Sequence, residues 1–207
     1  MSMLAIALAL TAASGPALSQ DAMLRGYLAC AAKRHDAEMH LLLDTKDEGD
    51  YRAAADTVTD DAKCDTKDEA TATVVYAAFG PERGKLRGMV AEVLLKRSKT
   101  ASRLAPQAPL STYTAGWFAM TGRPQPIDEM AMCVAAINPG GITRLLATKP
   151  ASSAQRDAFA ALTPSLGTCL AKGYQLDTKP AGLRAALAEA LYHRDYYAGA
   201  PGGGASK

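Results

Sequence analysis

Apolar side chains recur at every fourth position in two stretches of the chain, residues 86–97 and 183–194. In the first stretch the repeating positions are Leu86, Val90 and Leu94. This spacing places them on one face of a helix, and we expect that face to be turned toward a core. The two stretches therefore predict two helices of about three turns each.

The rest of the chain also favours helix over strand. Apolar residues make up 48% of the sequence but only 6% is aromatic, so most of them are Ala, Leu, Val and Met. Ala and Leu are strong helix formers. The best strand candidate, Thr-Val-Val-Tyr at residues 73–76, lies in alanine-rich sequence and is predicted as helix. We therefore predict an all-α fold.

The chain contains an internal repeat. Cys30 and Cys64 are 34 residues apart, and Cys133 and Cys169 are 36 apart. The first Cys of each pair is followed by a leucine-rich stretch that ends in Thr, and the second Cys is followed by one of the two long helical stretches. Those helical stretches share the same residue at six of twelve positions. Recurrence of order, spacing and motif predicts a duplication, that is, two pseudo-symmetric units of four to five short helices each.

The chain has four cysteines, Cys30, Cys64, Cys133 and Cys169. An even number of cysteines in an exported chain predicts disulfides, here two. Pairing within each unit is expected, and pairing between units is the alternative. A zinc site is disfavoured because no two of these cysteines lie within four residues of each other.

An arginine and a glutamate recur five residues apart in both long helical stretches. They are Arg87 with Glu92, and Arg184 with Glu189. We expect each arginine to have a structural role first, in which it binds a carbonyl of a neighbouring helix or loop. A groove between the units that both pairs share is a further possibility. The same helical pattern predicts a solvent-facing position for His193.

The sequence predicts five segments. Residues 3–13 form an apolar run that is too short to span a bilayer but fits a secretory signal. Small residues at 17 and 19 provide a cleavage site after residue 19. No Lys or Arg precedes the run, which is unusual for such a signal. The segments are a signal peptide at 1–19, helical unit 1 at 20–99, a linker rich in proline and aromatic residues at 100–126, helical unit 2 at 127–197, and a disordered Gly-rich tail at 198–207. We expect an exported protein, periplasmic or secreted, with no transmembrane segment in the mature chain.

The order of these motifs resembles a group of small secreted bacterial proteins of uncharacterised function. The resemblance rests on a Cys, a Leu-Leu-x-Thr stretch, a second Cys, and a Leu-Arg-x-x-Leu-Ala-Glu-x-Leu-Tyr segment. It covers most of the mature chain and is fuller in the second unit, because the first unit has Leu95 where the second has Tyr192. The resemblance implies export and helical structure, and it implies no activity.

Candidate metal sites are incomplete. Residues 35–40 hold two histidines, an aspartate and a glutamate, but His35 and His40 are five residues apart and do not share a helical face as a zinc motif requires. Residues 44–49 resemble the start of a calcium loop, but Lys46 occupies a ligand position. We assign no metal ligands and expect no cofactor.

Candidate catalytic motifs are incomplete as well. Residues 80–85 contain two glycines and a Lys, but the segment is too short for a phosphate-binding loop and lacks its Ser or Thr. We expect a turn between helices there. Ser165 lies in Pro-Ser-Leu-Gly rather than in a nucleophile motif. We assign no catalytic or cofactor-binding residues.

A short aromatic patch in the linker, Tyr113, Trp117 and Phe118, is the candidate interaction site, since Trp and Tyr are favoured interface anchors. The alternative is that Trp117 fills the seam between the two units.

The formal charge of +2 gives no basic stripe for nucleic acid. We expect a non-catalytic interaction or binding module of the cell envelope whose partner is a protein or a small ligand. The alternatives are an envelope hydrolase with a scattered site, and a carrier of a small ligand or metal.

Overall fold

The computed structural model describes residues 19–64 and 68–199. Residues 1–18 of the predicted signal peptide and residues 200–207 of the predicted tail lie outside this part of the chain. Within it, all regular structure is helical, so the predicted all-α class is confirmed. The helices are α1 (Gln20–Arg34), α2 (Asp36–Asp44), α3 (Glu48–Thr59), α4 (Asp68–Phe79), α5 (Arg83–Arg97), the 3-10 helices η1 (Ala101–Arg103) and η2 (Gly116–Met120), α6 (Gln125–Ile137), α7 (Pro139–Ala147), α8 (Ser153–Cys169) and α9 (Pro180–Gly199).

Polar side chains set the starts of several helices. Asp47 accepts hydrogen bonds from the backbone of the first turn of α3, Asn138 does so for α7, and Ser152 for α8. Each satisfies amide groups that have no partner inside the helix. Residues 73–76, the best strand candidate of the sequence, lie within α4 as expected.

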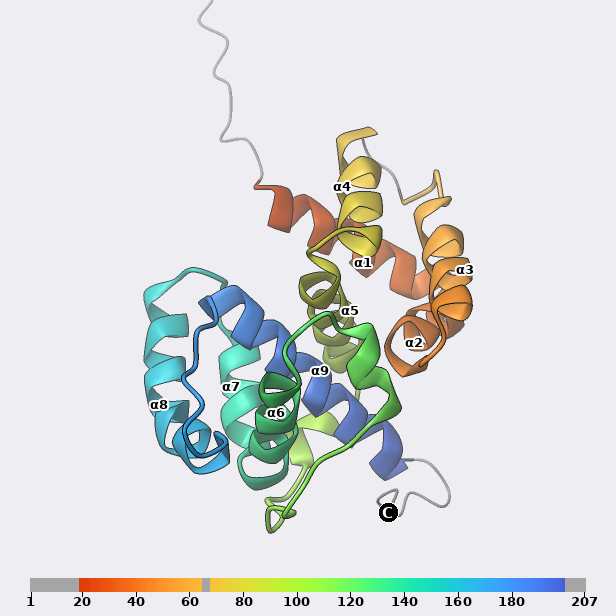
Figure 1. Ribbon diagram of the computed structural model, residues 1–207. Helices are drawn as coiled ribbons and strands as arrows, with labels where there is room; N and C mark the ends of the chain where they lie inside the picture. Colours follow the sequence, from red (N-terminus) through yellow and green to blue (C-terminus); the bar gives the residue numbers. More distant parts are fainter. Residues whose placement is uncertain (1–18, 65–67, 200–207) are drawn as a thin grey trace, which may run out of the picture.

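The helices form two groups that meet at α5 and α9 (Figure 1). Helices α1, α2 and α4 pack against α5, while α6 and α7 pack against α9 and α8 covers α6 and α7. The most extensive contact between any two helices is that of α5 with α9. Each group has its own apolar core, but Ala188 and Tyr192 of α9 belong to the core of the first group. We call the two groups the first half (α1–α5) and the second half (α6–α9).

A disulfide closes within each half. Cys30 of α1 is bonded to Cys64 after α3, and Cys133 of α6 is bonded to Cys169 at the end of α8. Closing loops of 34 and 36 residues stabilises each half by about 4 kcal/mol in the chain-entropy model. Disulfides of this kind are consistent with export to an oxidising compartment.

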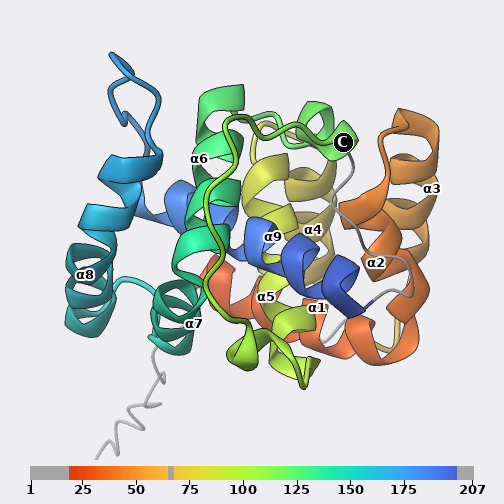
Figure 2. The same cartoon turned by 90° about the horizontal axis from the view of Figure 1, so that it is seen from below.

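The connection between α5 and α6 crosses the molecule in front of α6 and α9 (Figure 2). It is fixed to both: Gln107 N donates to Ala136 O at 2.8 Å, and Ser98 Oγ donates to Asp195 of α9 at 2.5 Å. The predicted linker is therefore packed onto the second half through specific hydrogen bonds.

In the described part of the chain, no single helix is both long and apolar enough to cross a membrane.

Candidate ligand-binding cleft

The two halves meet where α5 and α9 come into backbone contact. A Cβ atom added at Gly88 of α5 would lie 2.3 Å from both Cα and Cβ of Ala185 in α9. Carbon atoms in ordinary contact are about 3.5–4.0 Å apart, so only glycine fits at this position. Gly88 thereby allows the close approach that brings the charged side chains of α5 and α9 together.

Ion pairs cross between the two helices in both directions. Arg87 of α5 donates from Nε to Glu189 of α9 at 2.8 Å, and Arg184 of α9 donates from Nε to Glu92 of α5 at 2.8 Å. None of the four side chains is more than 3% exposed. Both glutamates are buried because α5 and α9 lie between the two groups of helices.

Each of these arginines also binds the end of another helix, as the sequence analysis expected. The guanidinium of Arg87 donates to the last turn of α2, and that of Arg184 donates to the last turn of α7. The acceptors are the carbonyl oxygens of Leu42 and Leu43 for Arg87, and those of Leu145 and Leu146 for Arg184. Carbonyl groups in a last turn have no partner within their own helix, so the guanidinium groups satisfy them.

These recurring contacts are what the predicted duplication would produce, and the pseudo-symmetric relation itself stays a prediction.

A second arginine binds each buried glutamate. Arg25 of α1 reaches Glu92 at 2.7 Å, and Arg123, which precedes α6, reaches Glu189 at 2.6 Å. Burial raises the pKa of each glutamate, but the paired guanidinium groups outweigh it and hold the pKa below its usual range, most strongly at Glu189. Both carboxylates are therefore ionised at neutral pH.

The two charge clusters differ in one respect. The Glu189 cluster (Arg87, Arg123, Asp128 and Glu189) contains a second acid, because Arg123 Nε also binds Asp128 at 2.7 Å. Burial raises the pKa of Asp128, yet both its oxygens accept hydrogen bonds, from Arg123 and Thr121, which suits an ionised carboxylate.

The Glu92 cluster (Arg25, Arg184 and Glu92) has two cations and one anion in mutual contact. One guanidinium charge in it is therefore not neutralised within the cluster.

The Glu92 cluster lines a cleft of about 730 Å³ between the halves. One wall comes from α1 and α5, and the other comes from α8, the loop before it, and the start of α9. Apolar side chains of both walls face it, among them Met89, Phe159, Leu166 and Leu183.

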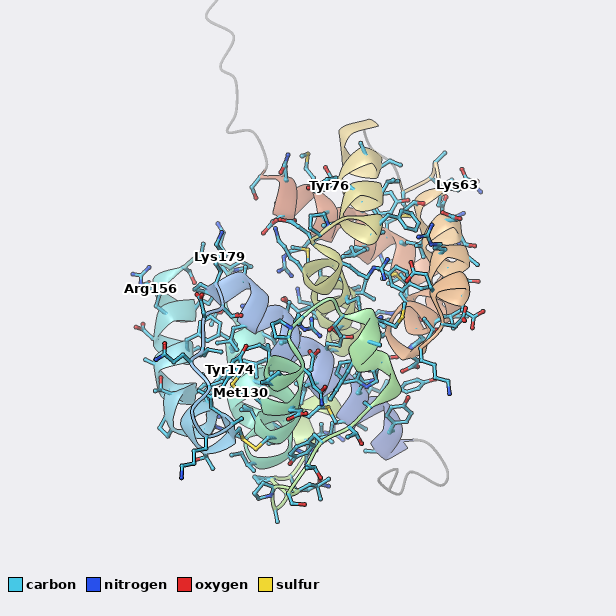
Figure 3. All side chains as sticks on the ribbon, in the orientation of Figure 1. Lys63, Tyr76, Met130, Arg156, Tyr174 and Lys179 are labelled. Atoms are coloured by element: carbon cyan, nitrogen blue, oxygen red, sulfur yellow. A yellow bond between two sulfur atoms is a disulfide. The ribbon has the colours of Figure 1, made fainter. Side chains whose placement is uncertain are left out.

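Basic side chains surround the opening of this cleft. Lys85, Arg156 and Lys179 all line it, and Lys85 is paired with Asp21 at 2.8 Å. Figure 3 places Arg156 and Lys179 near each other, where α8 and α9 begin, and Lys63 at the opposite side of the molecule. The cleft thus combines an apolar interior with positive charge at its edge.

The candidate interaction patch of the linker lies elsewhere. Trp117 is only 4% exposed and stacks on His193 of α9, with ring centroids 4.1 Å apart and planes 12° from parallel. Phe118 contacts the Trp117 ring edge to face and is partly exposed, and the hydroxyl of Tyr113 accepts a hydrogen bond from Leu110 N at 2.9 Å. Trp117 is therefore a buried packing residue in this structure rather than an exposed anchor.

His193 itself, predicted to face solvent, is 1% exposed. That prediction is wrong because the linker folds back over α9 and covers it with Trp117.

The candidate metal-binding residues are dispersed among separate networks. His35 Nε2 contacts Asp61 at 2.8 Å, whereas His40 Nδ1 contacts the hydroxyl of Tyr192 at 2.5 Å. Asp47 is occupied as the cap of α3. Over residues 19–64 and 68–199, no group of three His, Cys, Asp or Glu side chains is arranged to hold a metal ion.

A second hollow of about 270 Å³ lies beside His40, Tyr196 and Asp195. It is smaller than the 300–1,000 Å³ typical of ligand sites, so the cleft between the halves is the stronger candidate.

The sequence analysis anticipated a groove between the units but identified only Arg184 and Glu92 among the residues that line it. Nothing in the local pattern marks Arg25 or Phe159, because they meet the other cleft residues only through the packing of α1 and α8 against the seam. Comparison with protein families, curated proteins and solved structures finds no match for this chain.

Proposed function

We propose that the protein is an exported, non-catalytic binding protein whose ligand occupies the cleft between its two halves. The observation that carries this proposal is the cleft itself, with a volume of about 730 Å³ and an apolar interior that also contains a few fixed charges. Sites for small molecules typically have this size and this mixture of lining groups.

The cleft walls are held in place before any ligand arrives. A disulfide closes each half, and the crossed pairs of Arg87 with Glu189 and Arg184 with Glu92 join the halves. A preformed site loses little conformational entropy on binding, which favours affinity. This rigidity supports a binding role.

The buried acid of the cleft is poorly suited to catalysis. A general acid or base needs a pKa near the working pH, whereas Arg184 and Arg25 hold the pKa of Glu92 below its usual range. Glu92 therefore serves to position the two guanidinium groups. A binding role is favoured over the hydrolase alternative on this ground.

The proposed location is outside the cytoplasm, in the periplasm or secreted. All the cysteines are paired in disulfides, and the apolar run at residues 3–13 fits an export signal.

Filling the cleft tests the proposal. Ala160 of α8 is exposed and lines the cleft, whereas the neighbouring Ala161 is exposed but does not line it. The probe is N-phenyl-1-naphthylamine, an uncharged dye that fluoresces strongly in apolar surroundings. We expect saturable binding to the wild type and to Ala161→Trp, and loss of binding in Ala160→Trp.

Circular dichroism of both variants checks that they keep the fold. Equal binding of the dye by the two variants, or no saturable binding by the wild type, would refute the proposed function.

A further inference from the structure

We propose that the cleft selects a ligand with an apolar body and one anionic head group, and that the head group binds at Arg25. This inference rests on the proposed function, because it specifies the chemistry of the ligand in the same cleft. It is carried by the unbalanced charge of the Glu92 cluster, by an unsatisfied donor on Arg25 and by the charges at the edge of the cleft.

The comparison of the two charge clusters gives the first argument. Each has a buried glutamate bound by two arginines, but Asp128 neutralises the second arginine of the Glu189 cluster. The corresponding arginine of the Glu92 cluster, Arg25, is paired with no second acid among the described residues and lines the cleft instead. Since the remaining charge lies beside the cleft, an anionic ligand would complete the Glu92 cluster as Asp128 completes the other.

The hydrogen bonding of Arg25 gives the second argument. Its Nη1 and Nη2 both donate to Glu92, at 2.7 and 3.3 Å. Its Nε is buried and has no hydrogen-bond acceptor among the described residues. A buried donor without a partner costs about 1–3 kcal/mol, so the protein alone does not fully satisfy the Arg25 guanidinium. The side chain remains 22% exposed, which leaves it open to a ligand.

The edge of the cleft gives the third argument. Among the described lining residues five are cationic, whereas only Asp21 and Glu92 are anionic. Neither Arg156 nor Lys179 forms an ion pair with a described residue, so their charges are available to attract an anion. Basic groups around an opening raise the local concentration of anions and their rate of association.

Apolar side chains on both walls of the cleft suit the apolar body of the ligand. Phe159 of α8 is half-buried and, with Met89 and Leu183, presents hydrocarbon to the cleft. A small inorganic anion would leave this surface exposed to water, whereas an alkyl or aromatic group would cover it. Burial of apolar area contributes about 25 cal/mol per Å², so the body adds affinity to what the head group supplies.

Isothermal titration with octanoate and with octan-1-ol at neutral pH tests the inference, because the two molecules differ in the charged head group and share the alkyl chain. Arg25→Gln removes the proposed contact. Arg103→Gln makes the same change at an exposed position outside the cleft. We expect the wild type and Arg103→Gln to bind octanoate more tightly than octan-1-ol. Arg25→Gln should weaken octanoate binding by about tenfold or more and weaken octan-1-ol binding much less, since hydrogen bonds to charged groups contribute about 1.5–3 kcal/mol.

Circular dichroism checks that Arg25→Gln is folded. If Arg25→Gln does not fold, Lys179→Gln replaces it, and we expect weaker octanoate binding and a smaller dependence of that binding on salt. Equal affinity of the wild type for both molecules would overturn the anionic head group while leaving the proposed function intact. Binding of neither molecule would overturn both.

Discussion

A single methyl group at Gly88 should separate the two halves. The Cβ of alanine at this position would lie 2.3 Å from Cα and Cβ of Ala185 and 2.8 Å from its carbonyl oxygen. Two of these three atoms belong to the backbone of α9, so no change of side-chain rotamer removes the overlap. The helices must move apart, and the crossed ion pairs beside them must lengthen.

The size of the effect follows from two opposing contributions. Replacing glycine by alanine inside a helix stabilises it by about 1 kcal/mol. Overpacking a core position costs about 1–3 kcal/mol, occasionally more, and a clash with backbone belongs at the upper end of that range. We therefore expect Gly88→Ala to lower the free energy of unfolding by about 2 kcal/mol. In a chain of this length this corresponds to a fall in Tm of roughly 4–8 °C.

Gly26→Ala in α1 is the matched control, because a Cβ atom there would have nothing within 4 Å. It should raise stability by about 0.5–1 kcal/mol. The assay is thermal and urea unfolding of the oxidised proteins, followed by circular dichroism. If Gly88→Ala were stabilised as much as Gly26→Ala, then α5 and α9 would not be in backbone contact, and the description of the seam would be wrong.

Two further predictions concern charged groups. Arg87→Met should destabilise the fold by about 3–5 kcal/mol, because it leaves the buried Glu189 with only one of its two arginines. Arg52→Met, the control at an exposed ion pair, should change stability by less than about 1 kcal/mol. Urea unfolding measures the stability of both variants. The Arg34 guanidinium beside Asp61 lowers the pKa of that carboxyl from 3.8 to about 2, so its stabilising contribution is present above about pH 4 and is lost as the pH falls toward 2. Asp61→Asn should therefore flatten the dependence of Tm on pH in this range, and an unchanged pH dependence would contradict the assignment.

Much of the fold could be predicted from local sequence. The helical class follows from composition and from apolar spacing such as that of Leu183, Leu187 and Leu191. The starts of α7 and α8 follow from Asn138 and Ser152, whose side chains act within a few residues of their position. The spacing of the cysteines also favoured disulfides within each half, because the predicted repeat places one pair of cysteines in each unit.

The burial of charged groups could not be predicted in this way. In α5 and α9 the amphipathic pattern places Glu92, Glu189 and His193 opposite the apolar face, which normally means toward water. These helices lie between the two groups of helices, where the three side chains are buried, and both glutamates are paired with arginines far away in sequence. The recurrence of Arg87 and Arg184 was the one available signal, and it correctly indicated bonds to carbonyl groups.

The aromatic residues of the linker show the same limit. The composition around Trp117 suits either an interface or a packing role, and only the path of the linker across α9 decides where the indole ring lies. The cleft depends likewise on the relative positions of the two halves, which the Arg–Glu pairs between α5 and α9 determine.

Photoaffinity labelling tests most directly the central claim that ligands occupy the cleft between the halves. An octanoate analogue that carries a diazirine on its alkyl chain would be irradiated with the oxidised protein, and the labelled peptides would be mapped by mass spectrometry. The main alternative is the exposed apolar face of α4, where Val75, Tyr76 and Phe79 are 40%, 61% and 37% exposed. We predict labels in α5, α8 and α9, near Met89, Phe159 and Leu183, that unlabelled octanoate suppresses; labels confined to α4 would contradict the account.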